Sequence, residues 1–334
     1  MVSYTGLSPA VTITVEPARA RNRQRREKLV SALVTLVGLS GIAAVVLIFV
    51  FVGKEALPLF TDAATHAEAG LDKMFWPQIV RAGKPAVFMW QPVSTVPKIS
   101  MVPLFLGTLK ITAVAMLLAV PFGVAAAVWV SEFAPRRLQE IIKPVIELLA
   151  GIPSVVLGFF ALVVLATTLQ DTLGFTYRLN AFLAGVGLAL AITPVIFTVT
   201  EDALAAVPRS YREGSLALGA TRLETALRVV LPAAAPGVLA AVVLGLGRAI
   251  GETMIVLMAS GNAALVSPGI GDSARSLSAT IAAEMGEVVV GSTHYRLLFF
   301  IGVELFLVTF VLNSVASAWV RRLMRRVSGA GVPQ

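Results

Sequence analysis

Six long apolar stretches constrain this chain more than any other feature of its sequence. A helix needs about 20 mainly apolar residues to cross the hydrocarbon core of a bilayer. The stretches that reach this length are 29–52, 102–130, 144–169, 181–200, 233–259 and 297–320. Only 14% of the residues are charged, against about a quarter in soluble domains. The sequence therefore predicts an all-α, polytopic membrane protein with six transmembrane helices.

The first apolar stretch follows a cluster of basic residues between Arg19 and Lys28. A secretory signal peptide has a similar order, but its apolar core is shorter and a small-residue cleavage site follows it. No such site is clear after residue 52. We therefore interpret this stretch as a retained signal anchor.

The positions of Lys and Arg predict the orientation of the spans. Basic residues concentrate in the N-terminal tail, after the second and fourth stretches, and after the sixth. Cytoplasmic segments of membrane proteins carry such an excess, so both termini are expected to be cytoplasmic, in a multi-pass protein of the inner or plasma membrane. The net charge of +8 then results mainly from the basic residues that set the orientation of the spans. Nucleic acid is not an expected partner.

The same patterns predict five regions along the chain. Residues 1–28 form a basic cytoplasmic tail, 29–53 the first transmembrane helix, and 54–100 an extracytoplasmic loop. The loop is rich in aromatic residues and prolines, which favours a folded cap against the spans. Residues 101–320 form a block of five helices with an amphipathic connection at 201–231, and 321–334 a second cytoplasmic tail.

The sequence argues against several kinds of active site. There is no Cys, and His66 and His294 lie outside the apolar stretches, so we expect no metal site. No G-x-x-x-x-G-K-[ST] motif for nucleotide phosphates is present. A glycine-rich stretch within the fifth span does not have the spacing of a dinucleotide-binding fingerprint. Its glycines are Gly245, Gly247 and Gly251. We expect no catalytic residues and no cofactor bound by this chain.

Two charges, Arg248 and Glu252, interrupt the fifth apolar stretch. A charge at the bilayer centre costs at least about 2.5–3.5 kcal/mol. Residues four apart share one face of a helix, so the two side chains are expected to pair. Small residues on the same side, which let another helix approach closely, are Gly237, Ala241 and Gly245. We expect the pair to face a neighbouring subunit or an aqueous path, either as a structural ion pair or as a site where an anion meets the guanidinium.

The connection between the fourth and fifth stretches carries a second motif. Glu213-Gly214-Ser215 is followed after three residues by Gly219, and nine residues later come Val229, one residue, and Leu231-Pro232. This spacing resembles the EAA signature of ATP-binding-cassette importer permeases. The resemblance implies a short coupling helix that docks into an ATPase subunit, with site residues Glu213, Gly214, Ser215, Gly219, Leu231 and Pro232.

Two of these residues fit that role on physical grounds. Gly219 suits the position after a helix end, where a residue without Cβ can turn the chain, and Pro232 suits the first turn of the next helix. The departure from the signature is Gly214-Ser215 in place of two alanines, which lowers helix propensity by about 1 kcal/mol for the glycine. The alternative is an interfacial helix without a partner, held at the lipid headgroups by basic side chains, which would be Arg209, Arg212 and Arg222.

A longer resemblance surrounds this motif. The stretch from "AVPRSYREGSLALGATRLE" to "GRAIGETMIVLMASGN", with "GIPSVVLGFFALVVL" before it, is similar to the PstC-type permease family of phosphate importers. The resemblance implies a type I importer (MetI-like) fold and a substrate path through Arg248 and Glu252. It also implies partners: a second permease of the PstA type, an ATPase dimer of the PstB type that uses the ATP, an extracytoplasmic phosphate-binding protein of the PstS type, and membrane lipid.

Other functions remain open from the residues alone. The chain could carry another oxyanion such as sulfate or molybdate, act as a passive anion channel or carrier, or serve as a signalling scaffold. Charged residues without an assigned role are Lys110, Glu147, Glu201, Asp202 and Glu304. We expect Lys110 to reach toward the membrane surface, and Glu201 and Asp202 to be solvated.

Overall fold

The computed structural model describes residues 17–79, 86–94 and 96–329. Contacts divide the chain into two compact units, Met1–Phe51 and Val52–Gln334. Residues 1–16 of the predicted basic tail, Arg81 and Lys84 of the predicted loop, and the last five residues of the C-terminal tail lie outside the described residues.

Six helices are long and apolar enough to cross a membrane in the part of the chain that the structure describes. Their bounds are Arg26–Thr61, Val102–Glu132, Ser154–Leu173, Ala181–Ala205, Arg222–Gly251 and Thr293–Arg322. The predicted all-α class and the number of spans are confirmed. The third and fifth spans differ from the predicted ranges.

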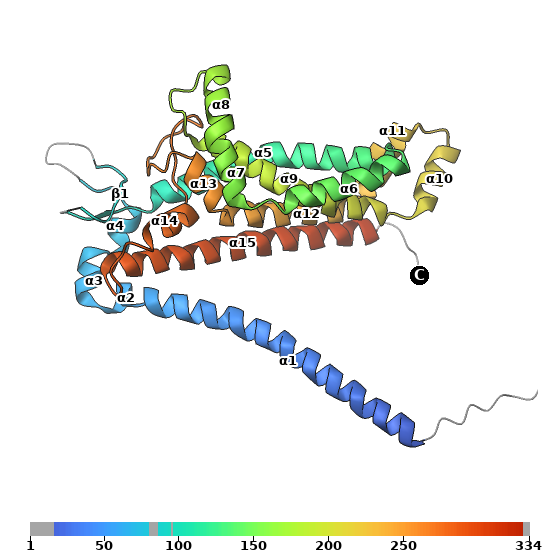
Figure 1. Ribbon diagram of the computed structural model, residues 1–334, viewed down its shortest axis with the longest axis horizontal. Helices are drawn as coiled ribbons and strands as arrows, with labels where there is room; N and C mark the ends of the chain where they lie inside the picture. Colours follow the sequence, from blue (N-terminus) through green and yellow to red (C-terminus); the bar gives the residue numbers. More distant parts are fainter. Residues whose placement is uncertain (1–16, 80–85, 95, 330–334) are drawn as a thin grey trace, which may run out of the picture. The chain divides into compact units, whose positions relative to one another are not determined.

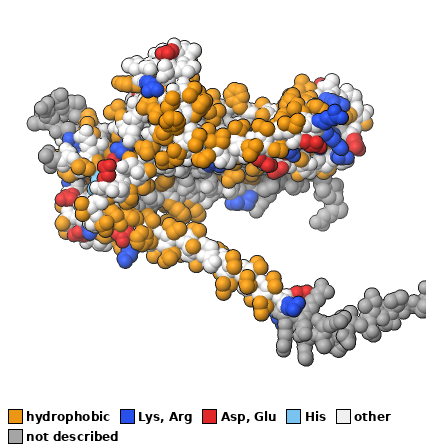
Figure 2. All heavy atoms as spheres, viewed as in Figure 1, with side chains coloured by type: hydrophobic (Ala, Val, Ile, Leu, Met, Phe, Trp, Pro, Cys, Tyr) orange, Lys and Arg blue, Asp and Glu red, His pale blue; other side chains and the backbone are white. Residues whose placement is uncertain are grey.

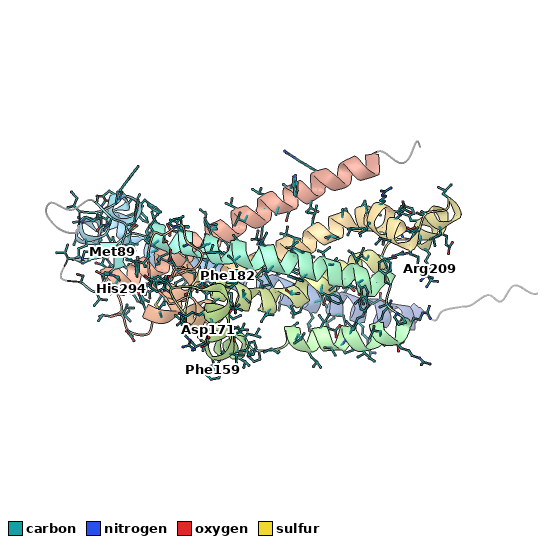
Figure 3. All side chains as sticks on the ribbon, turned by 90° about the horizontal axis from the view of Figure 1, so that it is seen from above. Met89, Phe159, Asp171, Phe182, Arg209 and His294 are labelled. Atoms are coloured by element: carbon teal, nitrogen blue, oxygen red, sulfur yellow. The ribbon has the colours of Figure 1, made fainter. Side chains whose placement is uncertain are left out.

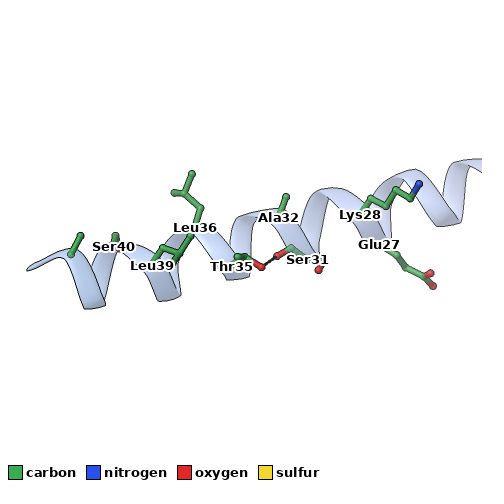
Figure 4. Close-up of a pocket in the computed structure, with 9 residues that line it drawn as sticks. Glu27, Lys28, Ser31, Ala32, Thr35, Leu36, Leu39 and Ser40 are labelled. Atoms are coloured by element: carbon green, nitrogen blue, oxygen red, sulfur yellow. Dashed lines mark hydrogen bonds between the residues drawn. The ribbon is translucent and has the colours of Figure 1, made fainter.

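The first unit consists of most of helix α1, Pro17–Ala56, which begins before the predicted apolar stretch and includes the basic cluster. Hydroxyl groups in its apolar part are bonded to the helix itself: Thr35 Oγ1 donates to the Ser31 carbonyl and Ser40 Oγ to the Val37 carbonyl, each at 2.8 Å. This pairing lets polar residues stand in a span without an unsatisfied group. Figure 4 shows the described residues of α1 that line a shallow hollow, which extends from Glu27 to Ala43 along one side of the helix.

The described part of the predicted loop folds into short elements. These are α2 Pro58–Thr61, α3 Ala63–Glu68, α4 Leu71–Phe75, and the strands β1 Trp90–Gln91 and β2 Lys98–Ile99. The strands pair antiparallel, with Trp90 opposite Ile99. Leu59, Met74 and Trp90 share a buried cluster with Leu277 and Leu298. The segment is therefore a folded cap, as its composition predicts.

Four long helices form the body of the second unit. They are α5 Val102–Glu132, α9 Ala181–Ala205, α12 Leu231–Gly251 and α15 Thr293–Gly329, and they run side by side in Figure 1. Helix α9 lies at the centre, packed on α5 and α12, and α15 packs on α12. Small core residues such as Ala115, Ala119 and Ala184 allow this close approach, which compensates for the missing hydrophobic drive between helices in lipid.

The two ends of this bundle differ in character. One end carries α10 Arg209–Ala217 and α11 Arg222–Thr225, and the other carries α14 Leu277–Glu284 and the cap. We call them the α10 end and the α14 end. In Figure 2 hydrophobic side chains cover the sides of the helices, and Lys and Arg side chains gather at the α10 end. Figure 3 likewise places Arg209 at one end and Met89 and His294 at the other.

The third apolar stretch does not form one span over 144–169. Helix α6, Arg136–Ala150, ends at Gly151, and a new helical run begins after Pro153 with α7 Ser154–Phe160, a π-helical turn η1 Ala161–Leu165 and α8 Ala166–Leu173. The ring of Pro153 disfavours helical dihedrals at Ile152 before it, so α6 does not continue into α7. Helix α6 is amphipathic, with Ile142 and Ile146 packed on the core and Glu147 exposed.

The fifth stretch also departs from its predicted range of 233–259. An unbroken helical run extends from Arg222 through α11, the π-helical turn η2 Ala226–Val230 and α12, and it ends at Gly251. Glu252 has an extended backbone (φ −67°, ψ 132°), and a short helix α13, Met254–Ala259, follows. The Glu252 carbonyl accepts a hydrogen bond from Ser278 Oγ at 2.7 Å. This bond to α14 replaces the one that a continuing helix would supply.

Candidate functional site

The segment with the EAA-like spacing forms a short exposed helix and a sharp turn. Helix α10 ends at Ala217, and Gly219 has a left-handed backbone with φ +86°. The Gly219 N–H donates to the Leu216 carbonyl at 3.0 Å and the Ala220 N–H to the Ser215 carbonyl at 3.2 Å. These two bonds are a Schellman motif, in which glycine is favoured at the left-handed position. The predicted role of Gly219 as the turn residue is confirmed.

Arg212 fastens this helix to the end of α5. Its guanidinium donates to the Glu132 carboxylate at 2.7 Å and to the Leu204 and Val207 carbonyls at 2.9 and 2.7 Å. The two charged side chains are 22% and 10% exposed. Arg212 is therefore occupied within the chain and does not serve as a free headgroup contact, as the alternative interpretation of this segment would require.

The turn after Gly219 is fixed by polar contacts as well. Thr221 and Glu224 form a capping box at the start of α11, which satisfies two otherwise unbonded backbone donors. Ser215 and Thr225 hydroxyls lie 3.0 Å apart, so Ser215 of the motif connects α10 to α11. Pro232 stands in the first turn of α12, but the helix is continuous from Arg222. Its missing N–H is accommodated next to the π-helical turn, a correction to the expected fresh helix start.

The outer face of α10 is left uncovered in this chain. Glu213 and Gly214 are exposed, no atom lies near the position that a Cβ on Gly214 would take, and Leu218 is 91% exposed. Tyr211 and Leu216 add exposed apolar surface on the same short helix. Apolar side chains exposed together at a charged end are typical of a surface that docks a protein partner.

Arg248 and Glu252 do not pair as expected. Within the described residues no ion pair joins them. The expected pairing requires a helix through both positions, and α12 ends at Gly251. Arg248 is exposed on the last turn of α12, and Glu252 is partly buried beyond its end.

The small residues of α12 face the core of the same chain. A Cβ at Gly237 would collide with Ala203 of α9, and one at Gly245 with Ile196 of the same helix. Ala241 is fully buried between them. The helix that the small residues allow to approach closely is therefore α9 of the same chain. Arg248 instead continues an exposed row with Ala240 and Leu244.

Arg248 lines a groove between α12 and α15 with a volume of about 840 Å³. On the α15 side the lining is polar, a feature that the sequence analysis missed. The residues are Thr309, Asn313, Ser317 and Arg321. Each of these residues is four positions from the next, and residues with this spacing share one face of a helix. The sequence therefore contained the information needed to predict a polar helix face.

A second polar cluster lies at the α14 end. Glu284 receives hydrogen bonds from Trp90 Nε1 at 3.1 and 3.2 Å, and it lies 2.7 Å from both Arg275 and His294. Burial by itself raises the pKa of Glu284, but the His294 bond, the Arg275 charge and the Trp90 bond together bring that pKa below its ordinary value. The cluster joins Trp90 of the cap to Glu284 of α14 and His294 of α15, and spacing along the chain gave no signal for it.

Three other charged residues, Lys110, Glu201 and Glu304, have partners within the chain or are buried. Lys110 donates to the Ser267 and Gly269 carbonyls at 2.6 and 2.8 Å, in the connection between α13 and α14. Glu201 is buried and paired with Lys143 at 2.7 Å, contrary to the expected solvation, whereas Asp202 is exposed. Glu304 is 9% exposed, and its Oε2 atom has no hydrogen-bond partner in the described chain.

Comparison with known families identifies the class of protein to which this fold and its exposed α10 helix belong. Residues 119–329 match the family described as "Binding-protein-dependent transport system inner membrane component". The chain belongs to this family of membrane subunits of ATP-binding-cassette importers.

Individual relatives support the same assignment. The chain is 36% identical over 296 residues to "Probable ABC transporter permease protein YqgH" of Bacillus subtilis, covering 87% of this chain and 90% of the relative. It is 32% identical over 305 residues to "Phosphate transport system permease protein PstC" of Mesorhizobium japonicum, covering 85% and 89%. The resemblance to PstC-type permeases is thereby confirmed.

The predicted MetI-like fold is confirmed by solved structures. An inward-facing structure of the MetNI methionine transporter superposes with a TM-score of 0.53 at 20% identity, covering 67% of this chain and 97% of that one. At this identity the likeness concerns the fold alone.

Proposed function

We propose that this chain is the transmembrane permease subunit of an ATP-driven importer of inorganic phosphate. The observation that carries the proposal is Arg248, a guanidinium without a carboxylate partner in the described chain, on the wall of a groove in an apolar span. Its planar fork of donors suits the oxygens of phosphate. The PstC relative of Mesorhizobium japonicum supports phosphate as the substrate.

Coupling to the ATPase is proposed to pass through α10. The residues in contact would be Glu213, Gly214, Ser215 and Gly219, with Leu231 and Pro232 at the entry to the span. The helical run from Arg222 to Gly251 has 30 residues, which is about 45 Å at 1.5 Å per residue. A displacement of α10 is therefore transmitted along one continuous element to the turn that carries Arg248.

The orientation and partners follow from this assignment. The α10 end is proposed to be cytoplasmic, with both termini on the same side, and the α14 end to face an extracytoplasmic phosphate-binding protein of the PstS type. A PstB-type ATPase dimer would bind and hydrolyse ATP, so this chain needs no nucleotide site or cofactor. A PstA-type permease would complete the path.

The sequence predicted a permanent ion pair between Glu252 and Arg248. Glu252 is proposed to have a different role. It follows the end of α12 directly, so one further helical turn would bring its carboxylate to Arg248. We propose that this extension happens when the path is empty, and that the separated state seen here leaves Arg248 available to an anion.

The test is phosphate uptake by the assembled importer in vesicles. Arg248→Gln is expected to abolish ATP-dependent uptake of labelled phosphate, while the four kinds of subunit still co-purify and α10 still couples to ATP hydrolysis. Arg248→Lys keeps the charge without the fork, and we expect it to retain partial uptake. Full uptake by Arg248→Gln would refute the assignment of the path.

The same assay separates phosphate from the other candidates. If excess sulfate or molybdate suppresses uptake of labelled phosphate, the chain serves another oxyanion. Uptake without ATP would indicate a passive channel or carrier. We expect neither result, because the exposed α10 helix is proposed to dock an ATPase.

A further inference from the structure

Helix α15 carries a row of polar residues through an otherwise apolar span. We call Thr309, Asn313, Ser317 and Arg321 the polar row. Each is four residues from the next, so all four lie on one helix face, and all four line the groove that Arg248 also lines. Polar side chains inside a membrane span are costly, and they usually mark a path or a site.

The helix that carries Arg248 approaches this row closely. A Cβ on Gly247 would stand 3.4 Å from both amide atoms of Asn313. The absence of a side chain at Gly247 therefore lets the Asn313 amide lie against the turn that carries Arg248. Asn313 and Arg248 are neighbours across the groove, although 65 positions separate them in the sequence.

The hydrogen-bonding groups of the row are largely free to receive a ligand. Thr309 Oγ1 donates to the Leu305 and Phe306 carbonyls of its own helix. For the Asn313 amide and the Ser317 hydroxyl, the described chain supplies no hydrogen-bond partner. Donors in this position can be satisfied by water or by a bound polar group.

The charges of the groove select for an anion. Its lining contains two guanidiniums, Arg248 and Arg321, and no Asp or Glu among the described lining residues. Twelve positions separate Thr309 from Arg321, so the row extends about 18 Å along the helix. A groove with a positive charge near each end and neutral donors between them favours an oxyanion over a cation.

We infer that the groove binds a phosphate-type oxyanion and passes it from Arg248 to Arg321 along Asn313 and Ser317. The Asn313 N–H and the Ser317 O–H donate to oxygens of the anion between the two guanidiniums. Both guanidiniums bind oxyanions through charge-assisted hydrogen bonds. If the anion is the transported phosphate, the inference rests on the proposed function and extends it to α15.

The test uses matched pairs of variants on α15 in the complete importer, with inorganic [³²P]phosphate as the probe. Asn313→Leu is compared with Ser314→Leu, and Arg321→Gln with Arg322→Gln, because Ser314 and Arg322 are neighbours that do not line the groove. We expect Asn313→Leu and Arg321→Gln to lower uptake about ten- to hundred-fold, the effect of losing a hydrogen bond to a charged group. The two neighbours should retain uptake near that of the unaltered chain.

Further variants separate binding from misfolding. Asn313→Asp stays polar and similar in size but places a negative charge in the groove, so we expect it to block uptake as strongly as Asn313→Leu. Arg321→Lys should recover much of the loss in Arg321→Gln. Assembly is followed by co-purification, and ATP hydrolysis stimulated by the binding protein should persist in every variant.

The lipid of the vesicles distinguishes the source of the anion. With phosphatidylcholine alone, an effect of the row variants on uptake identifies transported phosphate as the ligand. An effect that appears only after phosphatidylglycerol is added identifies a lipid headgroup instead.

The outcomes also separate this inference from the proposed function. If the unaltered importer takes up phosphate and Arg248→Gln abolishes it, but the row variants match their neighbours in both lipids, the inference is wrong and the proposed function stands. If the unaltered importer takes up no phosphate, the proposed function is wrong. The same variants then test the groove with labelled sulfate and molybdate. If their uptake of these anions equals that of the neighbouring control variants, the inference about the groove is wrong.

Discussion

The backbone conformation of two single residues determines where α10 and α12 end, and both helices belong to the part of the chain that is proposed to move. Gly219 turns the chain after α10 in a left-handed conformation, and Glu252 ends α12 in an extended one. The first was predictable from the sequence, because glycine in this position has a local steric reason. The second was not, because the break at Glu252 depends on a hydrogen bond from Ser278, a residue of another helix.

Substituting Gly219 tests the turn. Gly219→Ala forces a side chain into the left-handed region, which costs about 1–2 kcal/mol. We expect weaker coupling of ATP hydrolysis to transport and faster hydrogen exchange in residues 209–225. Gly41→Ala is the matched control: it lies within helix α1, outside the proposed coupling segment, with free space around it, so it should stabilise its helix by about 0.5–1 kcal/mol and leave coupling unchanged. Equal loss of coupling in both variants would contradict this account.

At the scale of elements, the apolar stretches predicted the number of helices better than their limits. Length and hydropathy are local properties, so the candidate spans Val102–Glu132, Ala181–Ala205 and Thr293–Arg322 begin and end near the predicted positions. The stretch at 144–169 includes an amphipathic helix and a span, and that at 233–259 includes most of a span and a short separate helix. Hydropathy alone does not reveal a break when both sides are apolar.

The connection between α10 and α5 gives a prediction at this scale. Arg212→Gln removes the charge that holds Glu132, and hydrogen bonds to charged groups contribute about 1.5–3 kcal/mol. We expect α10 to loosen, with faster hydrogen exchange over 209–217 and ATP hydrolysis that no longer depends on the binding protein. Arg209→Gln on the same helix is the control, because Arg209 is exposed. If exchange over α10 is unchanged in Arg212→Gln, the anchoring role is wrong.

At the scale of the whole second unit, ionic contacts hold the cap on the bundle at the α14 end. Glu284 joins Trp90 of the cap to Arg275 and His294. Asp62 of the cap pairs with Arg296 of α15 at 3.0 Å. The hydrogen bond from Thr65 is the main cause that lowers the pKa of Asp62, and the bond from Arg296 adds to it.

The pH dependence of the cap follows from these two carboxylates. Each has a pKa below its ordinary value in the folded chain, so its stabilising contribution is complete above the ordinary value and is lost as the pH falls through the lowered one. We expect hydrogen exchange in residues 58–75 to accelerate on acidification below about pH 4. Glu284→Gln should loosen the cap at neutral pH and reduce this dependence. If hydrogen exchange in residues 58–75 of the unaltered chain is the same below about pH 4 as at neutral pH, the prediction is wrong.

The sequence by itself determined the class of protein, the number of spans and the place of the segment with the EAA-like spacing. These features depend on local periodicity, run length and spacing, and they concern residues that are close in the chain. Arg248 was also visible as a charge in an apolar span.

Only the tertiary structure decided what surrounds Arg248. The end of α12 separates it from Glu252, the small residues of α12 turn toward α9, and Gly247 admits Asn313 from α15. The cluster of Trp90, Arg275, Glu284 and His294 likewise brings together distant parts of the chain. A side chain's partner depends on which helix faces overlap after packing, and spacing along one segment does not contain that information.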